Sequence, residues 1–129
     1  MAVIADSSVL VAAFHVKDSL HENGVSAVAN AQKPILVPEY VAIETAGVLA
    51  LRAHDKIAKE FIRVLLEAGD MQLLRPHSDH FYNAAAYFSA TKLRLSLVDC
   101  SFVVLSRDFD TITFDKVLAK AIRQERRKL

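Results

Sequence analysis

The sequence predicts an α/β fold in which a central, mostly parallel sheet of four or five strands carries helices on both faces. Short apolar runs alternate with longer segments of helical periodicity, which is the pattern of parallel strands joined by crossover helices. Only three of the 129 residues are glycine, and no long polar linker interrupts the chain. We therefore expect a single domain over residues 1–129.

The expected strands and helices of the first half follow one another in short order. Strands are predicted at residues 2–5, 35–37 and 71–74, and helices at 19–31, 39–53 and 55–70. Pro38 suits the first turn of a helix, where its missing N–H costs nothing. Gly69 is a C-cap that ends the third helix. In the helix 39–53, one face is expected to hold Val41, Glu44, Val48 and Leu51.

The second half repeats this alternation. A helix is predicted over residues 77–93, with one apolar face made of Phe81, Ala84, Ala85 and Phe88. A second helix begins near Asp99, a strand covers residues 111–114, and the remaining residues form a C-terminal helix. Strands that alternate with helices along the whole chain imply one mostly parallel sheet.

Composition narrows the class of protein. Hydrophobic residues make up 53% of the chain and charged residues 24%, as in globular proteins. The single cysteine, Cys100, excludes a disulfide within the chain, which fits a reducing compartment. No run approaches the roughly 18 apolar residues of a membrane span, and no signal peptide is evident. We expect a soluble, cytoplasmic protein with no membrane partner.

Acidic residues follow two of the predicted strands. Asp6 comes directly after the strand at 2–5, and Asp115 directly after the strand at 111–114. In open parallel sheets, ligands bind outside the carboxyl ends of the strands. Both acids are therefore expected at the edge of the sheet where a site would form.

Two further acids stand alone on apolar backgrounds. Glu44 is the only charge in "YVAIETAGVLAL", and Asp99 is the only charge in "LSLVDCSFVVL". Each of the four acids has an ordinary alternative, because Asp6, Asp99 and Asp115 could cap helices and Glu44 could face solvent. Together they suggest one electronegative pocket suited to a hard divalent cation. Such ions activate water and stabilise in-line displacement at phosphorus.

Other kinds of site lack their residues. Neither G-x-G-x-x-G nor G-x-x-x-x-G-K-[ST] occurs, so dinucleotide and P-loop sites are disfavoured. A haloacid-dehalogenase-like phosphatase would have a second Asp at position 8, which is Ser8. His77 and His80 have a metal-ligand spacing but more simply belong to a helix start.

The C-terminal tail is basic. The last eleven residues hold five of the 16 Lys and Arg residues and one of the 15 Asp and Glu residues, for a net charge of +4. The first 118 residues hold the other 11 basic and 14 acidic groups, for a net charge of −3. The tail cations could complement the helix dipole or could contact phosphates, and both interpretations stay open.

The order and spacing of four segments resemble the PIN-domain family, and within it the small VapC-like toxin ribonucleases of type II toxin–antitoxin systems. These segments are "VIADSSVLVA", "PEYVAIETAGVL", "LSLVDCSFVVLSR" and "TITFDKVLAKA". The resemblance implies a three-layer α/β/α sandwich, commonly a homodimer. It also implies endoribonuclease activity with Mg²⁺ or Mn²⁺, an RNA substrate and a cognate antitoxin.

The resemblance also assigns residues. It makes four acids the catalytic and metal-binding groups: Asp6, Glu44, Asp99 and Asp115. Ser7 and Thr113 would orient carboxylates or waters around them. Two departures from the family pattern are Ser8, where many members have Asn, and Val117, where many have a further acid. We expect four cations of the tail to contact the substrate: Arg123, Arg126, Arg127 and Lys128.

The resulting hypothesis is a divalent-metal-dependent endoribonuclease that is the toxin of a toxin–antitoxin pair. Two alternatives are an RNA-processing PIN nuclease without an antitoxin and a non-catalytic PIN module that binds RNA or protein. The four acids argue against the non-catalytic module, because an acid cluster repels RNA unless cations reverse the local field.

Overall fold

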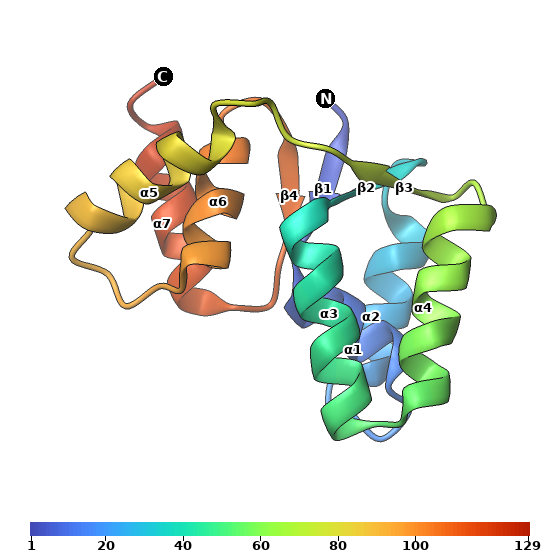
Figure 1. Cartoon of the computed structure of the whole chain (residues 1–129). Helices are drawn as coiled ribbons and strands as arrows, with labels where there is room; N and C mark the ends of the chain where they lie inside the picture. Colours follow the sequence, from blue (N-terminus) through green and yellow to red (C-terminus); the bar gives the residue numbers. More distant parts are fainter.

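A four-stranded, all-parallel sheet lies between two layers of helices in the computed structural model, which describes residues 1–129 (Figure 1). The strands are β1 (Val3–Ala5), β2 (Ile35–Pro38), β3 (Met71–Leu74) and β4 (Asp110–Ile112). Their order across the sheet is β3-β2-β1-β4, with β1 paired in parallel to both β2 and β4. The predicted α/β sandwich with a parallel sheet is confirmed.

The connections divide the helices between the two faces. The path from β1 through β2 to β3 uses α1 (Ser7–Phe14), α2 (His21–Asn30), α3 (Glu39–Arg52) and α4 (Asp55–Glu67). The path from β3 back to β4 runs the opposite way across the sheet, through α5 (His80–Ala90) and α6 (Leu97–Leu105). Crossover connections between parallel strands are right-handed. Two paths that cross the sheet in opposite directions therefore place their helices on opposite faces of the sheet. Figure 1 shows this division, with α7 (Lys116–Arg126) beside α5 and α6.

The core fills the space between the sheet and the helix layers. Ile4, Ile35 and Val37 are fully buried on the strands, where burial of both sheet faces favours β-branched residues. Phe61 of α4 and Phe102 of α6 are also fully buried. No helix is long and apolar enough to cross a membrane.

Helix α1 is absent from the sequence-based prediction. Its residues Val9, Leu10, Val11 and Ala12 are all buried, so the segment is apolar on every side and shows no helical stripe. Only its N-terminus carried a local signal. Asp6 accepts a hydrogen bond from the N–H of Ser8 at 3.4 Å and is the N-cap of α1.

The faces of α3 and α5 also differ from the prediction. Helix α3 buries Val41, Ala42, Thr45 and Leu49 against the core and leaves Leu51 89% exposed. Glu44 and Val48 therefore lie on a neighbouring, half-buried face. In α5, which packs against α6, Ala84 is fully buried while Phe81 and Phe88 are about half exposed.

Two boundaries also need correction, while the expected place of His80 at a helix start is confirmed. Helix α6 begins at Leu97, with Ser96 rather than Asp99 as its N-cap. Strand β4 ends at Ile112, before the expected Phe114. His80 is the first residue of α5, buried and stacked on Tyr40, so it is a packing residue. Gly69 follows α4 with φ of 79°, as expected for a C-cap glycine.

Candidate active site

The four acids singled out in the sequence line one pocket at the carboxyl edge of the sheet. The pocket has a volume of about 610 Å³ and is lined by side chains from α1, α3, α6 and the start of α7. Asp6 follows β1, and Asp115 follows β4 by three residues. Glu44 comes from the middle of α3 and Asp99 from the first turn of α6.

Asp6 is buried and held by hydroxyl groups. Its Oδ2 accepts hydrogen bonds from Ser8 Oγ at 2.7 Å and from Thr113 Oγ1 at 2.8 Å. Thr113 Oγ1 also accepts from the N–H of Asp115 at 3.0 Å, which links the first acid to the fourth. No hydrogen bond reaches Oδ1 of Asp6. One oxygen therefore fixes the side chain, and the other is free for a ligand.

Glu44 has a hydroxyl as its partner instead of a cation. Ser7 Oγ donates a hydrogen bond of 2.6 Å to Glu44 Oε1. Burial raises the pKa of Glu44, the Ser7 hydrogen bond opposes this shift, and the charges of Asp99 and Asp6 add to it. Because the side chain is half-buried and surrounded by acids, a bound cation would relieve an electrostatic cost already present in the fold.

Asp99 belongs to a capping box with the N-cap residue Ser96. Ser96 Oγ accepts from the N–H of Asp99 at 3.0 Å, and Asp99 Oδ2 accepts from the N–H of Ser96 at 3.1 Å. Burial raises the pKa of Asp99; its hydrogen bonds to Ser96 oppose this, and the charges of Asp6 and Asp115 add to it. The alternative in which Asp99 is itself the N-cap is wrong.

Asp115 has a structural role and a place in the pocket at once. Its Oδ1 accepts from the N–H groups of Val117 and Leu118, each at 3.0 Å, so it is the N-cap of α7. Its Oδ2 makes no hydrogen bond and the residue lines the pocket. Capping and ligand binding, which the sequence presented as alternatives for this acid, are compatible because a carboxylate has two oxygens.

The donor set fits a hard, hydrated cation. Each of the four carboxylates has one oxygen in a hydrogen bond and one oxygen without any: Oδ1 of Asp6, Oε2 of Glu44, Oδ1 of Asp99 and Oδ2 of Asp115. No three of these side chains already stand close enough to chelate an ion directly. Mg²⁺ commonly keeps several waters and uses one or two carboxylates, so a pocket of spaced acids suits it.

Ser8 and Arg52 line the pocket, although the sequence pattern assigned neither of them a role there. Ser8 donates to Asp6 and accepts from the N–H of Phe114 at 2.9 Å, so it ties α1 to the segment after β4. Its departure from the usual Asn therefore keeps a hydrogen-bonding side chain beside the first acid. Arg52 also lines the pocket. Arg52 is eight residues after Glu44 on the same predicted helix, and this spacing places both residues on one helical face. The spacing could therefore have predicted Arg52 as a residue of the site.

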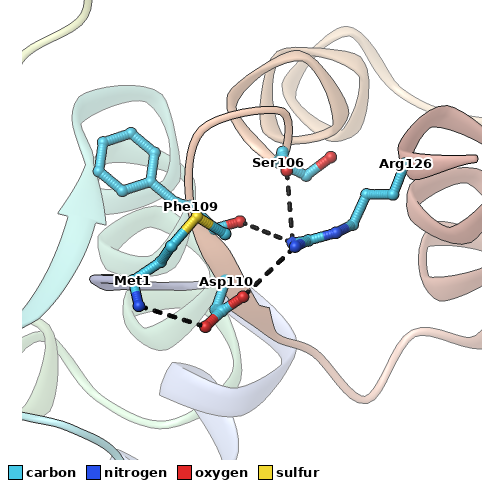
Figure 2. A network of polar contacts seen from close by, with 5 residues as sticks. All are labelled: Met1, Ser106, Phe109, Asp110 and Arg126. Atoms are coloured by element: carbon cyan, nitrogen blue, oxygen red, sulfur yellow. Dashed lines mark hydrogen bonds and ion pairs between the residues drawn. The ribbon is translucent and has the colours of Figure 1, made fainter. Parts of the chain in front are cut away.

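The basic tail lies at the other edge of the sheet. Arg126 Nη1 donates to the carbonyl oxygens of Phe109 at 3.1 Å and Ser106 at 3.5 Å, and its Nη2 reaches Asp110 at 3.5 Å (Figure 2). Asp110 begins β4, and the N-terminal ammonium of Met1 is 3.9 Å from it. These contacts place the end of α7 at the amino ends of the strands.

The remaining tail cations differ in their partners. Lys128 Nζ pairs with Glu125 at 3.0 Å, and Glu125 also accepts from Arg107. Arg123 and Arg127 are exposed and make no ion pair. Since α7 runs for 11 residues from Asp115, its end is about 16 Å from the acidic pocket.

The protein is an α/β sandwich with a parallel sheet in the order β3-β2-β1-β4. Four carboxylates form an acidic site at the carboxyl ends of its strands. A family model described as PIN domain matches residues 3–123, and the chain belongs to the PIN-domain family. The crystal structure of VapC20 of Mycobacterium tuberculosis, a toxin that cleaves the sarcin–ricin loop, superposes with a TM-score of 0.83. That match covers 93% of this chain and 95% of VapC20 at 18% sequence identity. No curated protein sequence matches the chain.

Proposed function

We propose that the protein is a divalent-metal-dependent endoribonuclease that hydrolyses RNA phosphodiester bonds. The observation that carries this proposal is the presence of four carboxylates in the lining of one pocket, each with one oxygen in a hydrogen bond and one oxygen without any. A pocket built only for stability would not gather four like charges, because two of them then have raised pKa values and cost stability. Acids whose pKa values are raised by burial and by neighbouring charges are concentrated at functional sites.

The chain's residues would divide the work as follows. Asp6, Glu44, Asp99 and Asp115 would hold Mg²⁺ or Mn²⁺, directly or through water. When bound, such a cation stabilises negative charge on a phosphate and makes water more acidic. Ser7 fixes the orientation of Glu44, and Thr113 fixes Asp6 and the start of α7. Such hydrogen bonds to ligands keep free oxygens aimed into a site.

The biological setting is part of the proposal. We infer a toxin of a toxin–antitoxin pair that acts in the cytoplasm, forms a homodimer and is blocked by a cognate antitoxin. The structural likeness to a VapC toxin supports this setting, together with the family membership. An RNA-processing PIN nuclease without an antitoxin is the alternative, and a short neighbouring reading frame with a DNA-binding N-terminus would favour the toxin. Substrate contacts by Arg123, Arg126, Arg127 and Lys128 stay a prediction.

The test of activity is incubation of purified protein with mixed RNAs in Mn²⁺, Mg²⁺ or EDTA, followed by mapping of the cut ends. Wild-type protein is expected to cut with either metal and not with EDTA. Asp6→Asn and Glu44→Gln should lose cleavage, while Asp55→Asn, an exposed change at the start of α4, should not. Ser7→Ala should cut about 10- to 100-fold more slowly. Equal cleavage by wild type and Asp6→Asn would show that the activity does not come from this pocket.

A further inference from the structure

The acidic pocket continues along α3 away from the acids. Glu44, Val48 and Arg52 follow one another at intervals of four residues, so they form a line along one face of the helix. Asp18 and Leu20, from the loop between α1 and α2, also line this pocket. The pocket thus has an acidic end at Glu44 and a cationic end at Arg52. The two ends are about 12 Å apart along the helix axis.

Arg52 is the only cation that lines this pocket, which also contains five acids. It is exposed and makes no ion pair or hydrogen bond within the chain. Arg63 of the neighbouring helix α4, by contrast, pairs with Glu60 and Glu67. A guanidinium with five donors and no internal partner is suited to bind a phosphate from outside.

We propose that Arg52 binds a phosphate that flanks the one being hydrolysed, so that the RNA strand lies along α3 from Glu44 towards the C-terminus of that helix. The inference rests on the proposed function and adds the path of the substrate to it. Val48 is half-buried and lies between Glu44 and Arg52 on α3, and Leu20, which is 43% exposed, also lines the pocket. They offer an apolar surface for the intervening sugar or base, while Arg52 offsets the repulsion of RNA by the acids.

The placement of the other cations supports Arg52 over the C-terminal tail for this contact. Arg126 is held by three groups around the start of β4, and Lys128 is held by Glu125. Arg126 therefore lies at the amino ends of the strands, opposite to the acids, and Lys128 follows it by two residues. Arg52 lies in the same pocket as the carboxylates, because it belongs to the helix that also carries Glu44.

The first experiment compares steady-state cleavage by wild type, Arg52→Gln, Arg52→Lys and Arg63→Gln in Mn²⁺. Arg63→Gln is the matched control, because it removes the same charge from the neighbouring helix outside the pocket. Arg52→Gln is expected to raise KM about tenfold and to leave kcat within about twofold, since a flanking contact is equally strong before and during reaction. Arg52→Lys should recover part of the loss, because it keeps the charge without the planar fork. Melting temperatures should be unchanged.

The second experiment locates the contact on the substrate. Single uncharged methylphosphonate linkages are placed in turn around the cleavage site of one RNA. For wild type, one flanking position should raise KM as much as Arg52→Gln does, and Arg52→Gln should be insensitive to that same position. The log–log salt slope of KM should fall by about 0.7 in Arg52→Gln and stay unchanged in Arg63→Gln.

The results separate this inference from the proposed function. If wild type cleaves RNA but Arg52→Gln and Arg63→Gln share one KM and one salt slope, Arg52 does not bind the substrate and only the inference fails. If wild type cleaves no RNA, the proposed function fails. In that case, fluorescence anisotropy measures the binding of a labelled single-stranded RNA of mixed sequence to the same variants. Weaker binding by Arg52→Gln than by Arg63→Gln would then support the role of Arg52, and equal binding would exclude it.

Discussion

Replacement of Asp99 by asparagine tests whether the pocket is a cation site or a set of helix caps. An asparagine side chain retains a carbonyl oxygen that can accept from the N–H of Ser96, so the capping box at the start of α6 survives. The charge is lost, and with it the repulsion between Asp99 and the neighbouring acids Asp6 and Asp115. In EDTA, Asp99→Asn is therefore expected to melt at or above the temperature of wild type.

The magnitudes follow from the capping contacts and from linkage. Asp99→Ala loses the capping acceptor, which costs about 1 kcal/mol, or about 4 °C for a chain of this length. Saturation of the pocket with Mn²⁺ at about 100 times its Kd stabilises the folded state by about 2.7 kcal/mol, or about 10 °C. Wild type should show this shift, and Asp99→Asn should lose most of it.

The pH dependence gives a second readout with a defined sign. A carboxyl whose pKa is raised in the folded state binds its proton more tightly there than in the unfolded chain. The stabilisation of the folded state that this carboxyl contributes is fully present below its ordinary pKa and is lost as the pH rises through the raised pKa. In EDTA, the melting temperature of wild type relative to Asp99→Asn should therefore fall between mildly acidic and neutral pH.

The assay is thermal melting of wild type, Asp99→Asn and Asp99→Ala with EDTA and with Mn²⁺, at neutral and mildly acidic pH. Asp55→Asn is the control for loss of an exposed acid at a helix start. If Asp99→Asn melts below wild type in EDTA and Mn²⁺ shifts neither protein, Asp99 is only a helix-capping residue and the metal-site reasoning is refuted.

Two further predictions concern the tail and the packing of α1 on α2. If the tail contacts RNA, the double variant Arg123→Gln, Arg127→Gln should lower the log–log salt slope of RNA binding by about 1.4. Arg126→Gln should instead lower the melting temperature, because the contacts of Arg126 are within the chain. An unchanged slope in the double variant would exclude the tail. Gly24→Ala should cost about 2 kcal/mol by thermal or urea unfolding, because its Cβ would lie 2.6 Å from a backbone nitrogen of α1. Gly47→Ala, with nothing within 4 Å, should stabilise α3 by about 0.5–1 kcal/mol, and equal effects of the two changes would contradict this account.

The sequence predicted the sheet and its acids through local patterns. Strands β1 and β2 are short apolar runs that each end before an acidic residue, and helical periodicity separates the strands, so the alternation is visible without the fold. Asp6 and Asp115 follow β1 and β4, and carboxyl ends of parallel strands meet at one edge. Helix α1 was missed because it is buried on all sides, and burial on all sides removes the periodic signal.

The tertiary structure decided how each acid is held and which cation accompanies the acids. Thr113 is 107 residues from Asp6 in the chain and donates to it, and Ser7 is 37 residues from Glu44. Contacts at such separations depend on how helices and strands pack, and no local propensity encodes them. Net charge singled out the C-terminal tail, yet the direction of α7 takes the tail to the opposite edge of the sheet. The periodicity of α3 instead places Arg52 in the same pocket as the acids, about 12 Å along the helix from Glu44, because residues four apart share one face of a helix.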